Sequence, residues 1–162
     1  EILSDEGFGV HVVRALKDTP LPEGVVLLEG GVGGFNLLGS IDGVDHLLVV
    51  DVMLLDAPPG ELHFIPDGSQ MREPGKQLLS FHHVGILELR DMWRLLGQEP
   101  RISFLVTPPE VLEWGTELSP PLAGALDAAV RLIPELCAEL IQTDSTDQGG
   151  RPRCIPQVSA SS

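Results

Sequence analysis

The stretch DHLLVVDVMLL, residues 45–55, carries the strongest strand signal of the chain and decides the fold prediction. Its Leu and Val residues follow one another instead of alternating with polar residues, which is typical of a strand buried on both faces of a parallel sheet. Around it, the segments VVLLEGG (25–31), ELHFI (61–65) and RISFLVT (101–107) predict three further strands. The run is too short to span a membrane, and Asp51 lies in its middle.

Segments with helical periodicity lie between and around these strands. They are FGVHVVRALKDT (8–19), GILELRDMWRLLG (85–97) and LAGALDAAVRLIPELCAELIQ (122–142), in which we expect Pro134 to introduce a kink. Strands separated by helices predict right-handed crossovers and an α/β fold, a three-layer α/β/α sandwich with a mostly parallel central sheet. Residues 1–142 are predicted to form this domain. Residues 143–162 contain few apolar side chains, so we expect a disordered C-terminal tail.

Length and charge narrow the class of protein. At 162 residues and 17.4 kDa the chain fits one domain with a sizeable core. A net charge of −14 argues against nucleic acid and anionic membrane surfaces as partners. Cys137 and Cys154 are far apart in the sequence and predict neither a disulfide framework nor a zinc site, which favours a cytoplasmic location.

Three polar features, two single acids and a pair of histidines, stand near the expected junctions between strands and helices. Asp51 is a carboxylate in an apolar strand, Glu6 lies just before a helix, and His82 and His83 precede another helix. Taken singly, each has a structural explanation: a strand-end aspartate that caps a loop, a solvated acid and an incidental loop histidine. Taken together at one sheet edge, two carboxylates and an imidazole suit a divalent ion such as Ni²⁺, Zn²⁺ or Mn²⁺.

Other chemistries find less support in the sequence. The glycine cluster EGGVGGFN (29–36) does not match the dinucleotide pattern G-x-G-x-x-G, and there is no G-x-S-x-G motif around a serine nucleophile. A hydrolase or phosphorylase acting on a small molecule needs an anion site, and the ten Lys and Arg residues are scattered along the chain. The sequence therefore predicts no such site.

Five blocks, taken in order, resemble the hydrogenase maturation proteases. They are EILSDEGFGVHVVRAL (1–16), LLEGGVGGFNLL (27–38), DHLLVVDVMLLDAPPGEL (45–62), SFHHVGILELRDMWRLLG (80–97) and TPPEVLEWGTELSPPL (107–122). The resemblance extends from residue 1 to about residue 140. It implies a cytoplasmic endopeptidase that removes the C-terminal extension from the large subunit of an [NiFe] hydrogenase. The expected partner is that subunit's precursor, and the protease is expected to be a monomer.

The resemblance also implies the site. Glu6, Asp51 and His82 match the family's three metal-binding positions, with His83 as the alternative if the alignment shifts by one residue. The nickel is expected to belong to the substrate, so that the protease recognises metal already placed in the immature subunit. A metal ion could polarise the scissile carbonyl or activate a water, or Asp51 or Glu6 could act as general base. The sequence does not choose among these roles.

The start of the chain raises two further expectations. If Glu6 is a ligand, Ser4 or Asp5 is expected to cap the following helix. Family members begin with a central strand that ends in Gly-Asn directly before the segment that opens this sequence. That strand is absent here, so we expect an N-terminally truncated chain in which neighbouring strands either close the gap or expose unpaired edges.

Departures from the family pattern concern specificity and activity. Where the family has an Asp-Gly-Gly-Thr-like segment for substrate recognition, this chain has Glu29, Gly30, Gly31 and Val32. Glu29 keeps the carboxylate, on a side chain one methylene longer than that of Asp, and Val32 lacks the hydroxyl of Thr. The alternative to an active protease is a non-catalytic relative that docks on the hydrogenase large subunit and senses the metal.

Overall fold

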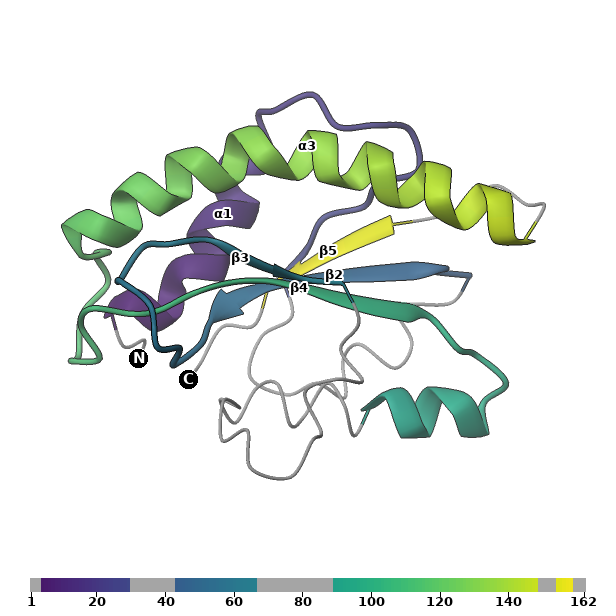
Figure 1. Cartoon of the computed structure of the whole chain (residues 1–162), viewed down its shortest axis with the longest axis horizontal. Helices are drawn as coiled ribbons and strands as arrows, with labels where there is room; N and C mark the ends of the chain where they lie inside the picture. Colours follow the sequence, from purple (N-terminus) through teal and green to yellow (C-terminus); the bar gives the residue numbers. More distant parts are fainter. Residues whose placement is uncertain (1–3, 30–42, 67–88, 149–153, 159–162) are drawn as a thin grey trace.

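The computed structural model describes residues 4–29, 43–66, 89–148 and 154–158 (Figure 1). The elements in chain order are η1 (Ser4–Gly7), α1 (Phe8–Leu16), β1 (Leu28–Glu29), β2 (His46–Val52), β3 (His63–Ile65), β4 (Arg101–Thr107), α3 (Pro120–Gln148) and β5 (Cys154–Val158). Residues 89–95 are also helical. The predicted strands and helices are present within these ranges, and α3 continues as one helix across Pro134.

The strands form one sheet in the order β1-β5-β2-β4-β3. Three neighbouring pairs are parallel, and only β3 runs antiparallel to β4 among the described strands. The predicted mixed α/β fold is confirmed. The three-layer arrangement stays a prediction, because the segments 30–42 and 67–88 lie outside the described residues.

Strand β2 is buried on both faces, as its continuous apolar sequence predicts. One face carries Leu48 and Val50, which pack with α1 and α3 in the main core. The other face carries Leu47 and Val49, which pack with Trp93 from the helical residues 89–95. Figure 1 shows α1 and α3 on one side of the sheet and this shorter helix on the opposite side. Because β2 has no solvent-facing side, a polar residue within it has to be explained.

The C-terminal segment differs from the predicted disordered tail. Helix α3 continues to Gln148, and β5 then pairs in parallel with β1 on one side and β2 on the other. The expectation that strands close a gap or expose unpaired edges is therefore wrong for this part of the described sheet. Composition misses such a segment because strand pairing uses backbone groups, which every residue except proline supplies in full.

Of the helices that the structure describes, none is both long and apolar enough to cross a bilayer.

Candidate functional site

Asp51 lies one residue before the carboxyl end of β2 and is fully buried. Its Oδ1 accepts a hydrogen bond from the backbone N–H of Val52 at 2.8 Å. By the alternation of the strand, its side chain is on the face of Leu47 and Val49, away from α1 and α3. Transferring a carboxylate from water to such a position is unfavourable unless polar or cationic groups meet it. Its burial in an apolar strand makes Asp51 a candidate for a functional role.

Glu6 lies on η1, one residue after the fully buried Asp5, and is itself half-buried. Helix η1 contacts β2, and Figure 1 shows the N-terminal segment beside the end of the sheet where the β2 arrow points. The structure therefore brings together the two elements that carry Glu6 and Asp51, at the carboxyl end of the sheet where α/β proteins bind their ligands.

The other predicted site residues lie outside the described residues. These are His82, the alternative His83, and the two glycines Gly30 and Gly31. Among the residues that the structure does describe, no group of three His, Cys, Asp or Glu side chains is placed to hold a metal ion. The three-residue metal set of Glu6, Asp51 and His82 therefore stays a prediction.

Asp5 has a structural role that differs from the predicted helix capping. Its Oδ2 accepts hydrogen bonds from the backbone N–H groups of Glu110 and Val111, at 2.8 and 2.7 Å. Its two oxygens also accept from the backbone N–H and the hydroxyl of Ser119, at 2.8 and 3.0 Å. The N-cap of α1 is Gly7, without a side-chain cap, so the capping prediction is wrong for Asp5.

Ser4 is not a helix cap either, because it binds the same loop as Asp5. Its backbone N–H and its hydroxyl both donate to the carbonyl of Glu113, at 2.9 and 3.1 Å. A Cβ on Gly115 would collide with the Ser4 hydroxyl, so the glycine permits this close approach. The loop of residues 108–119, which follows β4, is thus fixed to the segment that carries Glu6. Its Trp114 side chain is 74% exposed.

Sequence reasoning missed this clamp because its partners are more than 100 residues apart. The sequence offered one signal: EILSDEGFGV has three acids before a helix, and capping that helix needs only one of them. The structure assigns the second of them, Asp5, to the loop and leaves Glu6 as a separate group. This arrangement makes Asp5 a positioning residue for the site.

Glu29 ends β1 and faces two cations, Arg14 in α1 and Lys17 at the C-cap of α1. Its Oε1 accepts a hydrogen bond from Lys17 Nζ at 2.8 Å and lies 3.9 Å from Arg14 Nε. The Lys17 hydrogen bond, with the attraction of both cations, holds the pKa of the Glu29 carboxyl below its ordinary value, although partial burial acts in the opposite direction. The predicted substrate-recognition acid is therefore ionised and oriented by α1.

The sequence matches the family model for hydrogenase maturation protease over residues 10–136. This range includes most of α1, the whole of β2 and β4, and Asp51. The chain belongs to the hydrogenase maturation protease family. The resemblance and the enzyme class predicted from the sequence, a hydrogenase maturation endopeptidase, are thereby confirmed.

Individual relatives agree with the family match. The chain is 30% identical over 139 residues to the hydrogenase expression/formation protein HupD of Bradyrhizobium diazoefficiens, covering 84% of this chain and 72% of HupD. It is 30% identical over 135 residues to the hydrogenase 2 maturation protease of Escherichia coli, covering 82% of each. Among solved structures, the hydrogenase maturating endopeptidase HybD from E. coli aligns with a TM-score of 0.74 and 27% identity, over 86% of this chain and 87% of HybD.

Proposed function

We propose that this protease removes the C-terminal extension of the large-subunit precursor of an [NiFe] hydrogenase. The support is the family match over residues 10–136, together with a relative in E. coli that is named a hydrogenase 2 maturation protease. The observation that carries the proposal is Asp51, a carboxylate buried in an apolar strand within the matched range. The enzyme acts in the cytoplasm as a monomer, and its partner is the precursor subunit.

Nickel enters this proposal as part of the substrate. Asp51 and Glu6, with His82, contact the metal that the precursor already holds. The contact between η1 and β2 supports this assignment, because it brings the two carboxylate-bearing elements to one edge of the sheet. Carboxylate oxygens with one imidazole nitrogen are a suitable donor set for a borderline divalent ion. An unloaded precursor lacks the cation that would compensate the buried carboxylate, so it binds weakly.

The chain's own groups contribute position and charge. The clamp made by Asp5 holds Glu6 and the loop 108–119 in one arrangement, which lowers the entropy cost of assembling the site. Asp51 supplies negative charge in a water-poor environment, where its electrostatic effect is stronger than at the surface. Glu29, with Gly30 and Gly31, recognises the precursor near the cleavage position.

The experiment compares two forms of one substrate. Purified large-subunit precursor is incubated with the protease after nickel loading and, in parallel, without nickel, and the products are identified by mass spectrometry. Loss of a single C-terminal fragment from the loaded precursor alone supports the proposal. Equal cleavage of both forms contradicts nickel recognition, and cleavage of neither contradicts the protease assignment.

The docking alternative gives a different result in the same samples. A non-catalytic relative would co-purify with the loaded precursor and leave its length unchanged. A pull-down run beside the cleavage assay therefore separates binding without cleavage from complete loss of recognition.

A further inference from the structure

A pocket lies at the opposite end of the sheet from Asp51, where β4 begins. Its volume is about 440 Å³, and its lining includes Arg90, Arg94, Glu99, Arg101 and two prolines, Pro66 and Pro100. We call it the arginine pocket. The register pairs Arg101 with His46 and Val106 with Asp51. Five residues of strand therefore separate the arginine pocket from the candidate active site, a distance of about 16 Å.

The charge of this lining differs from that of the whole chain. Three of the ten Lys and Arg residues meet here against one lining acid, which gives the lining a formal charge of +2 in a protein of net charge −14. The sequence interpretation treats the basic residues as scattered along the chain, whereas these three arginines line one pocket. Glu99, and Asp91 next to Arg90 in the sequence, offset part of this positive charge.

Among the lining residues, the buried guanidinium of Arg90 gives the strongest indication of an anion site. Its side chain is only 15% exposed, and its buried Nε has no hydrogen-bond acceptor among the residues that the structure describes. The carboxylate of Asp91 lies 4.0 Å from Nε, beyond hydrogen-bond range. A buried guanidinium N–H without an acceptor is costly, and an oxyanion in the pocket would relieve this cost.

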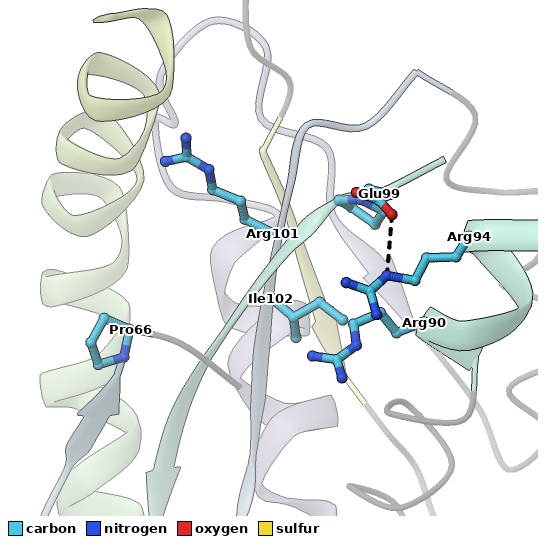
Figure 2. A pocket seen from close by; sticks show the side chains of 7 residues that line it. Pro66, Arg90, Arg94, Glu99, Arg101 and Ile102 are labelled. Atoms are coloured by element: carbon cyan, nitrogen blue, oxygen red, sulfur yellow. Dashed lines mark ion pairs between the residues drawn. The ribbon is translucent and has the colours of Figure 1, made fainter. Parts of the chain in front are cut away.

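Arg94 stands one helical turn after Arg90 and shares its face of the helix. Its Nε lies 3.2 Å from Glu99 Oε1, which orients the guanidinium. Figure 2 shows the guanidinium groups of Arg90 and Arg94 together beside Ile102, while Arg101 extends to the other side of the strand. Two planar forks on one side of a cavity suit an anion with several oxygens.

The helix that carries both arginines is held rigidly on the sheet. Leu89 and Trp93 are buried in the core that also contains Phe104 and Ile102. The backbone positions of Arg90 and Arg94 are therefore fixed by packing, and binding an anion needs little further ordering of this element.

We propose that the arginine pocket binds a small organic anion through a carboxylate or phosphate group, with Arg90 and Arg94 as the principal contacts. The prolines and Ile102 provide an apolar surface for the body of that ligand. The pocket volume falls within the usual range for small-molecule sites, roughly 300 to 1,000 Å³. The proposal does not depend on the protease function, because the two sites occupy opposite ends of the sheet.

The test is calorimetric titration of the full chain at low ionic strength with two probes, inorganic phosphate and succinate. We expect saturable binding of at least one probe, weakened about tenfold or more in Arg94→Gln and in Arg90→Gln, since each removes a charge-assisted contact. Arg94→Lys keeps the charge but loses the planar fork, so its affinity should lie between those of the wild type and Arg94→Gln. Tighter binding of phosphate assigns a phosphate ligand, and tighter binding of succinate assigns a carboxylate.

Arg131→Gln is the matched control, because Arg131 is an exposed arginine of α3 and its replacement makes the same change in net charge. Its affinity for the probes should equal that of the wild type. The half-exposed Arg94 allows its variants to be studied even if Arg90→Gln does not fold. Absence of binding by the folded wild type overturns the proposal, and so does equal weakening in Arg94→Gln and Arg131→Gln.

Discussion

At the scale of single residues, the carboxylate of Asp5 connects the N-terminal segment η1 to the loop 108–119. It is fully buried and accepts four hydrogen bonds, three of them from backbone N–H groups of the loop 108–119. Removing the buried carboxylate would leave these backbone N–H groups without their acceptor, and an unpaired buried N–H group is unfavourable. The neighbouring Glu6 takes its position from this clamp, so stability and site geometry depend on the same residue.

Asp5→Ala should therefore destabilise the protein strongly. Three backbone N–H groups and the Ser119 hydroxyl lose their acceptor, which we expect to lower the free energy of unfolding by about 3 kcal/mol or more. Urea denaturation followed by circular dichroism measures the change. Asp18→Ala, at an exposed position after α1, is the control and should differ from wild type by less than about 0.5 kcal/mol. Equal stability of the two variants would contradict the clamp.

At the scale of elements, two glycines that look alike in the sequence have opposite roles. Gly60 has a φ of +83°, and a Cβ there would meet the backbone carbonyl of Pro121. Gly124 lies in α3 with open space around it. The first glycine allows the turn before β3 to approach the start of α3, whereas the second only weakens the helix.

The two alanine substitutions should consequently move stability in opposite directions. Gly124→Ala should raise the free energy of unfolding by about 0.5 to 1 kcal/mol, because alanine favours the helix. Gly60→Ala should lower it by about 1 to 3 kcal/mol, through backbone strain and overpacking. Thermal unfolding of both variants checks this. A stabilising Gly60→Ala would show that the turn tolerates a side chain.

The contact between α1 and β1 depends on pH through Glu29. Since its pKa is lower in the folded state, this group contributes stability above its unfolded pKa, and the contribution is lost as pH falls through the folded pKa. The pair is substantially exposed, so Lys17→Gln should cost at most about 1 kcal/mol at pH 7.

Urea titrations of wild type and Lys17→Gln at a series of pH values measure this contribution. The difference in stability should be present at pH 7, shrink as the carboxyl of Glu29 is protonated, and be smaller in high salt. Glu23→Gln, at an exposed acid in the turn before β1, controls for general charge effects. A difference that grows on acidification would contradict the assignment.

At the scale of the whole molecule, the sheet depends on a strand from the far end of the chain. Strand β5 lies between β1 and β2, with Pro156 opposite Leu48 in the register. Proline lacks an N–H, so this interior strand forms one ladder hydrogen bond fewer than its length allows.

A chain that ends at Gln148 should lose this strand and expose the facing edges of β1 and β2. Unpaired edges promote association, so we expect a lower melting temperature and larger species in size-exclusion chromatography. A chain that ends at Val158 is the control and should behave as wild type. Unchanged melting and a monomeric profile after removal of 149–162 would contradict the placement of β5.

The sequence predicts well what local patterns encode. The continuous apolar run of β2 predicted a strand buried on both faces, and the apolar periodicity of residues 8–19 predicted helix α1. The clamp of Asp5, the pairing of β5 and the arginine pocket depend on partners far away in the chain, which no local pattern reports. Within the candidate site, Asp51 stood out because a carboxylate in an apolar strand conflicts with its surroundings.

The most direct measurement is the rate of precursor cleavage by wild type, Asp51→Asn and Asp56→Asn on nickel-loaded large subunit. Asp51→Asn nearly preserves the shape of the buried side chain and removes its charge, so we expect kcat/KM to fall by about 10² or more with folding retained. Asp56→Asn changes an exposed acid five residues later and should retain wild-type activity. Wild-type cleavage by a folded Asp51→Asn variant would contradict a role of Asp51 in cleavage, because the buried carboxylate would then have no part in the reaction.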